Sequence, residues 1–317
     1  MKHYSVKSIE EAWKHACYHH VENCQFVMDS DISKGPACCL SIAQPWRRVP
    51  SVATNPLIPF WLSVLAMTEQ DQDPAVIQQY VPEIAEFRDQ SNCFSLAMGA
   101  RFREYAGFDQ FNLVHETLRL GMQVVPVAIF DVEKDHALQH RPSALSVVFS
   151  MFGGDVNVVV NIDAMLLHEV PFHSELSVIS VWQEMLCAYL GKRIGSMDVV
   201  CGATAAMQSD SPAFRQIVDG DTSPELQNLP VMGNESDPEI LMSDFRTWPM
   251  VGVAGKGYKS DFFRHTVLPM AMVTQALKKE KVDLHDRKQL ACEAAQRISD
   301  VGWRGHVTNW VNNHFVE

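Results

Sequence analysis

The chain has 317 residues, of which 47% are apolar and 20% charged, so it can bury a large core as one large domain or two smaller ones. Its formal net charge of −12 argues against nucleic acid or an anionic membrane surface as the main partner, because both attract basic patches. No stretch reaches the roughly 20 apolar residues of a membrane span. These properties favour a small molecule as the partner.

The cysteines and histidines show no pattern of a disulfide framework or a metal site. Eight cysteines are scattered at irregular spacings, so we expect reduced thiols and a cytoplasmic protein. The pairs His15/His19 and His20/Cys24 have the i,i+4 spacing of metal ligands on a helix, but they point to different faces. A solvated, histidine-rich helix is favoured, and no metal is expected.

Helices are predicted first along the chain. The capping box Ser8-Ile9-Glu10-Glu11 precedes apolar residues at helical spacing, which predicts an amphipathic helix over residues 9–21. Further helices are predicted over 56–67, 74–87 and 109–120, and Gly121 ends the last of these.

A sheet and more helices follow. A β-branched strand is predicted over 124–130, and the runs 144–152 and 156–162 flank Gly153-Gly154 as a hairpin. The apolar segment 173–190 predicts a buried helix, followed by a strand over 197–202. Amphipathic segments over 268–281, 284–300 and 303–314 predict a helical C-terminal part. This order of elements is typical of an α+β fold.

Several motifs agree in order and spacing with one known family. They are Gln44-Pro45-Trp46-Arg47-Arg48, Asn55-Pro56 with Trp61, Gln79-Tyr80, Met98-Gly99-Ala100-Arg101-Phe102-Arg103, Asp109-Gln110, Arg141-Pro142-Ser143, Ile162-Asp163-Ala164, Pro171-Phe172-His173 and Gln183-Glu184. Over residues 30–210 the chain resembles a divergent thymidylate synthase, with motifs more similar to those of the pyrimidine-nucleotide hydroxymethylase branch. The resemblance implies a three-layer α+β fold with a mixed sheet, a buried central helix and a C-terminal helical extension. It places the α/β domain at residues 1–260 and the extension at 261–317.

The chain departs from this family at the residues that carry its chemistry. Ser143 stands at the position of the nucleophilic cysteine, and a hydroxyl is a poorer nucleophile than a thiolate unless a base activates it. The acid/base glutamate falls on Leu57 or Ile58, and the phosphate-binding arginine before Asp163 is replaced by Val160 or Ile162. Thymidylate synthesis itself is therefore not expected.

Three polar residues are the catalytic candidates. Ser143 is a nucleophile if His173 lies beside it as a base, and the alternatives are a serine bonded to its own backbone and a histidine that caps the helix. The resemblance gives Asp163 a hydrogen bond to a ring amide or ammonium, and its alternative is a turn contact.

The candidates for substrate binding surround the same pocket in the family. They are Arg101, Trp46, Arg47, Arg48, Lys34 and Gln183. Lys34 stands for a phosphate-binding arginine of the family. Arginines on such loops are more often solvated or paired with acidic groups than bound to a ligand.

Three functions are compatible with the sequence. The first is an enzyme repurposed for a small molecule other than deoxyuridine monophosphate, for which the resemblance implies folate-dependent one-carbon transfer or hydroxymethylation, a tetrahydrofolate derivative as cofactor, and a homodimer formed through the sheet. The second is a non-catalytic binding or regulatory protein. The third is a nucleotide hydroxymethylase in which Cys38 or Cys39 supplies the nucleophile.

Overall fold

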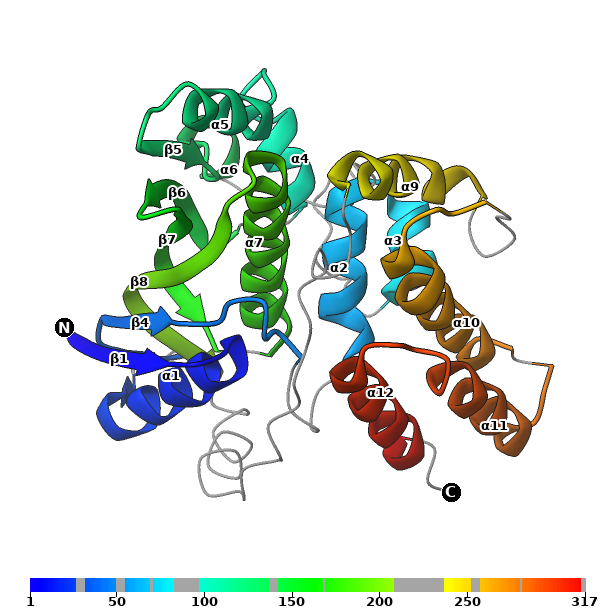
Figure 1. Ribbon diagram of the computed structural model, residues 1–317. Helices are drawn as coiled ribbons and strands as arrows, with labels where there is room; N and C mark the ends of the chain where they lie inside the picture. The colour runs from blue at the N-terminus through cyan, green and yellow to red at the C-terminus, as the bar shows by residue number, and fades with distance from the viewer. Residues whose placement is uncertain are drawn as a thin grey trace.

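The computed structural model describes residues 1–26, 32–49, 55–68, 71–82, 97–136, 142–167, 169–207, 237–251, 257–279 and 281–314. They form an α+β protein in which a mixed sheet lies beside a group of helices (Figure 1), as the sequence predicts. The elements are β1 (Lys2–Val6), α1 (Ile9–Asn23), β2 (Gln25–Phe26), β3 (Ile32–Gly35), β4 (Cys38–Ile42), α2 (Leu57–Thr68), α3 (Pro74–Tyr80), α4 (Met98–Arg103), α5 (Gln110–Arg119), β5 (Val124–Ala128), α6 (Val132–Asp135), β6 (Ala144–Phe152), β7 (Asp155–Leu166), α7 (Glu169–Leu190), β8 (Arg193–Met207), α9 (Pro238–Val251), the π-helix η4 (Phe263–Val267), α10 (Leu268–Leu277), α11 (Leu284–Ala295) and α12 (Val301–His314).

The sheet has eight strands among the described residues, in the order β1-β4-β8-β7-β6-β5, with β3 also paired to β8 and β2 to β3. Strands β1 and β4 are parallel, as are β7 and β8, and the other pairs are antiparallel. The long strand β8 pairs with β4 over residues 197–201 in its middle and with β3 over residues 204–207 at its end. It therefore joins the N-terminal strands to the rest of the sheet.

The middle of the sheet forms from one continuous stretch of chain. Strands β6 and β7 make the hairpin that the sequence predicts, and its turn residues Gly153 and Gly154 have φ angles of 61° and 90°. Both angles are positive, as a two-residue turn matching the twist of the strands requires, and glycine adopts them without strain. Helix α7 then connects β7 to the parallel strand β8.

Among the described elements, helices cover one face of the sheet and leave the other, here called the open face, without a helix. Helices α1, α5 and α7 pack on the covered face, and α7 is buried along most of its length, as expected for the central helix. Burial therefore alternates along the strands. In β6, Val147 and Phe149 are buried, whereas Val148 and Ser150 are half-buried. The open face mixes apolar and polar side chains.

Helix α2 lies between the sheet-bearing part and the C-terminal helices (Figure 1). It packs on α7 on one side and on α9 on the other. Trp61 of α2 stacks on Trp248 of α9 at a ring-centroid distance of 5.9 Å, and its Nε1 donates to Thr274 Oγ1 of α10 at 2.9 Å. All residues of α2 are buried, because both of its sides are covered.

Helix α4 is held tightly against α2. A Cβ atom at Gly99 would lie 2.3 Å from Ala66 O, so only glycine allows this approach of the two backbones. The backbone N of Gly99 donates to Asp71 Oδ2 at 2.5 Å. Burial raises the pKa of Asp71 to about 7, although hydrogen bonds from Gly99 and Ala100 and the charge of Arg103 act in the opposite direction.

The predicted elements agree with the structure in place and type but differ at their ends. The first helix begins where the capping box predicts, since Ser8 Oγ accepts from the backbone N of Glu11 at 3.1 Å. The helix predicted over 74–87 is observed as α3, and residues 83–87 lie outside the described residues. The strand predicted over 197–202 is the middle of the longer β8. The helix predicted over 284–300 ends at Ala295 as α11.

Candidate functional site

Ser143 lies immediately before β6, and its partner is Glu175 in the first half of α7. Ser143 Oγ donates to Glu175 Oε2 at 2.6 Å. The backbone N of Ser143 donates to Oε1 at 3.0 Å, and the backbone N of Ala144 donates to Oε2 at 3.1 Å. One carboxylate therefore accepts three hydrogen bonds from two consecutive residues, and it fixes the start of β6.

The carboxyl group of Glu175 is buried and has unusual acidity. Burial raises its pKa, and this effect outweighs the hydrogen bonds from Ser143 and Ala144 and the charge of Arg101, which lower it. A carboxylate with a raised pKa is a stronger base than an exposed one. The pair of a half-buried serine and a buried base has the arrangement of an activated nucleophile.

Sequence reasoning missed Glu175 and chose His173 as the partner of Ser143. In the structure Ser143 bonds to Glu175, while His173 Nε2 lies 3.0 Å from Glu10 Oε2 of α1 and the histidine ring packs edge-on against Trp13. Burial alone would raise the pKa of Glu10, but the hydrogen bond and charge of His173, together with Lys14, lower it. His173 therefore joins α7 to α1.

A second buried cluster includes Arg101, a predicted ligand-binding residue. Its guanidinium donates to both carboxylate oxygens of Asp135, with distances of 2.8 and 2.9 Å, and to the carbonyl of Ile129 at 2.7 Å. Tyr105 OH also donates to Asp135. Both members of this ion pair are buried, and the arginine bonds hold α4 to the segments around β5 and α6.

Asp163 lies next to Ser143 across the β6–β7 hairpin. Its backbone N donates to the carbonyl of Ser143 at 3.1 Å, and its side chain is exposed. The structure therefore brings Ser143 and Asp163 together through the backbone, with Glu175 added to them, while it places His173 at α1.

The predicted binding residues Trp46, Arg47 and Arg48 follow β4, and they differ in burial. Arg48 is buried, and its Nη1 donates to Glu184 Oε1 at 2.5 Å and to Ser180 Oγ at 2.8 Å, both on α7. Trp46 and Arg47 are half-buried, and Arg47 Nη1 donates to Gln44 Oε1 at 3.3 Å. Arg48 thus forms a buried ion pair.

The last two binding candidates lie elsewhere. Gln183 is fully buried in α7, and its Nε2 donates to the carbonyl of Val156 in β7 at 2.7 Å, which attaches the helix to the sheet. Lys34 is exposed on β3. Arg141, quoted in the resemblance, lies outside the described residues.

The two cysteines that could replace the nucleophile lie in β4. A hydrogen bond with Cys201 and burial raise the pKa of Cys38, which lies opposite Cys201 in the sheet. Burial and the charge of Asp198 raise the pKa of Cys39. Both shifts favour the neutral thiol over the reactive thiolate.

The buried guanidinium groups of Arg48 and Arg101 are paired with Glu184 and Asp135, so neither offers an uncompensated positive charge to the glutamate carboxylates of a tetrahydrofolate. Within the described ranges, no group of three or more His, Cys, Asp and Glu side chains could hold a metal ion. No described helix has the length and apolar character needed to cross a bilayer.

Comparison with known proteins adds no family to this description. No model of a protein family matches the sequence, and no curated protein matches it either.

Proposed function

We propose that this protein is an enzyme of thymidylate synthase-like architecture that acts on a small molecule other than deoxyuridine monophosphate. The single observation that carries the proposal is the 2.6 Å hydrogen bond from Ser143 Oγ to the buried Glu175. It is supported by the position of Ser143, which is where the resemblance places the nucleophile. One-carbon transfer or hydroxymethylation is the reaction class that the resemblance favours.

In the proposed mechanism Ser143 is the nucleophile and Glu175 the general base. The Oγ–carbon bond forms at an electrophilic carbon of a polarised double bond in the substrate, the π electron pair of that double bond moves to its far atom, and the hydroxyl proton passes to Oε2 of Glu175. The same proton returns to Oγ when that bond breaks. The backbone N of Ser143 and that of Ala144 hold the carboxylate in place throughout.

A serine-directed fluorophosphonate tests the nucleophile without knowledge of the substrate. We expect the intact protein to form an adduct at Ser143, located by peptide mass spectrometry, and Ser143→Ala to abolish it. The reaction should accelerate as pH rises through the pKa of Glu175, which lies above the usual carboxyl range, because only the ionised carboxylate accepts the proton.

Ser146 provides the matched control. It lies in β6, three residues after Ser143, and its hydroxyl accepts from Asn161 Nδ2 at 3.0 Å rather than donating to a carboxylate. Ser146→Ala should leave labelling unchanged, and Glu175→Gln should slow it about 100-fold. Equal labelling of Ser143 and Ser146, or no adduct at Ser143 in a large reagent excess at pH 8, would refute the proposal.

A non-catalytic binding protein is the second candidate, and a specific observation favours it. Glu175 accepts both backbone N–H groups at the start of β6, so it has a structural role whether or not the serine reacts. A thermal-shift screen with folates, pyrimidines, nucleosides and amino acids should find a stabilising ligand under either candidate. Turnover of any such ligand would exclude this second function.

We also propose that the protein forms a homodimer through the open face of the sheet, as the resemblance implies. Val148, Val159 and Val200 are half-buried on this face, between polar pairs such as Ser146 with Asn161. Val159→Lys should dissociate the dimer, and light scattering measures the mass. A monomer in the unaltered protein would contradict this proposal.

A further inference from the structure

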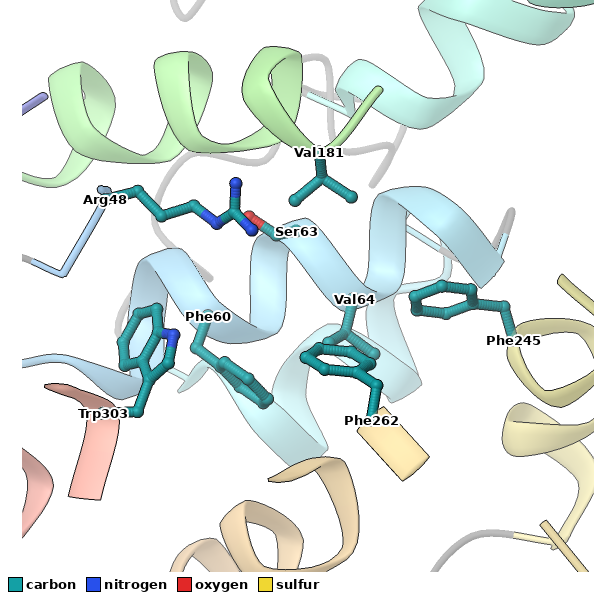
Figure 2. A pocket seen from close by; sticks show the side chains of 8 residues that line it. All are labelled: Arg48, Phe60, Ser63, Val64, Val181, Phe245, Phe262 and Trp303. Atoms are coloured by element: carbon teal, nitrogen blue, oxygen red, sulfur yellow. The ribbon is translucent and has the colours of Figure 1, made fainter. Parts of the chain in front are cut away.

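A pocket lies between α7, α2 and the C-terminal helices, away from Ser143. It opens to solvent, and its enclosed part is narrow, so a ring bound here would lie partly in the open mouth. Figure 2 shows Arg48 and Ser63 on the α7 side of α2, and the rings of Phe60, Phe262 and Trp303 on the side of the C-terminal helices. One end of the pocket is therefore polar and the other aromatic.

The aromatic end is built from rings that already contact one another. Phe60 meets Trp303 edge-on at a centroid distance of 5.3 Å, and it lies 6.4 Å from Phe262. Phe60 and Trp303 are buried, whereas Phe262 is half-buried at the mouth. A planar ring that enters beside Phe262 would bind against flat apolar surfaces on several sides.

The polar end has hydrogen-bond donors that a ligand could use. Nη1 of Arg48 donates to Ser180 and Glu184, but Nε and Nη2 make no hydrogen bond to any residue in the described part of the chain. These two atoms form the side-on fork of a guanidinium, which suits an oxygen acceptor. The arginine is only 4% exposed, so an acceptor here would bond to donors that are largely removed from water.

The ion pair of Arg48 and Glu184 favours a neutral hydrogen-bond acceptor over an anionic one. Glu184 already neutralises Arg48 at 2.5 Å, and both side chains are buried. An anionic ligand would bring a second negative charge to a pair that is already neutral, and burying that charge would be unfavourable. A neutral carbonyl oxygen accepts the same two hydrogen bonds without that cost.

We propose that this pocket is a binding site for a small uncharged aromatic ring that carries a carbonyl group, with the ring against Phe60, Phe262 and Trp303 and the oxygen on the fork of Arg48. The site is separate from the Ser143–Glu175 pair and does not rest on the function proposed above.

Benzamide and benzoate test the proposal, because they have nearly the same shape and differ in charge. Titration followed by saturation-transfer NMR and by the indole signal of Trp303 should show benzamide binding with a Kd on the order of 1 mM. Benzoate and toluene should each bind at least tenfold more weakly, since one adds a charge and the other lacks the acceptor. Ser143→Ala should leave benzamide binding unchanged.

Two buried arginines supply a matched pair of variants. Arg48→Lys keeps a cation beside Glu184 but removes the fork, so benzamide binding should weaken at least tenfold. Arg101→Lys makes the same change in the other buried ion pair and should leave benzamide binding unchanged. If Arg48→Lys does not fold, Phe262→Ala at the mouth should weaken benzamide binding at least threefold in a folded protein.

Several results would overturn the inference. They are tighter binding of benzoate than of benzamide to the unaltered protein, no response of the Trp303 signal to benzamide, and equal loss of binding in Arg48→Lys and Arg101→Lys. The first two require no variant.

Discussion

Glu175→Gln is the substitution that separates the structural role of Glu175 from its proposed chemical role. The carboxylate has two oxygens for three donors, with Oε1 accepting from the backbone N of Ser143 and Oε2 from Ser143 Oγ and the backbone N of Ala144. Glutamine keeps the shape of the side chain but replaces one oxygen by an NH₂ group, which donates and does not accept.

The loss of stability follows from the donors that remain. Whichever way the amide turns, its NH₂ group faces the backbone N–H of Ser143 or that of Ala144, and one buried N–H group loses its acceptor. The expected loss is about 1–3 kcal/mol in the free energy of unfolding. Because the pKa of Glu175 is raised, the unaltered protein loses stability as pH rises from the usual carboxyl range through that pKa, whereas glutamine does not titrate.

Urea unfolding of both proteins at about pH 4.5 and pH 8 measures these quantities. The destabilisation caused by Glu175→Gln should be larger at the lower pH and should shrink at the higher pH. A variant as stable as the unaltered protein at both values would refute the bonding scheme at the start of β6. A difference that grows with pH would refute the direction of the pKa shift.

Three further substitutions test other buried contacts. Asp71→Asn should gain stability relative to the unaltered protein as pH rises from about 4 to 8, by a total of about 4 kcal/mol, because the pKa of Asp71 is raised to about 7 and its ionisation destabilises the fold. Equal pH dependence of the two proteins in urea unfolding would contradict this. Gly99→Ala should cost about 1–3 kcal/mol or more, measured by thermal unfolding, because the new Cβ would lie 2.3 Å from Ala66 O. Glu184→Ala should lower the free energy of unfolding by about 3–5 kcal/mol, because it leaves the charge of Arg48 unpaired. The double variant Glu184→Ala with Arg48→Met should recover much of that loss.

The elements that the sequence predicts well are those whose signals are local. The Gly153-Gly154 turn and the capping box at Ser8 specify backbone geometry within a few residues, and both are observed. The sequence does not predict strands β1, β3 and β4. They are four or five residues long and include polar residues such as His3 and Ser41, so they depend on pairing with distant strands.

The site shows the same limit. Ser143 was chosen from its position in a motif, but its partner Glu175 is 32 residues away, and nothing local distinguishes this glutamate from an ordinary helix residue. Arg48 and Arg101 were chosen as ligand-binding cations, while their carboxylate partners lie 136 and 34 residues further along the chain. Pairing at such distances is a product of the fold, and motif reading does not supply it.

The position of β8 has a consequence for synthesis on the ribosome. Ser41 of β4 donates to Asp198 of β8, which is 157 residues later in the chain. The N-terminal strands therefore emerge long before the strand that completes their hydrogen bonding, while β6, β7, α7 and β8 emerge together. We expect the nascent chain to expose two strand edges during this interval, which makes the early segment a natural client for chaperones that cover unpaired β-structure.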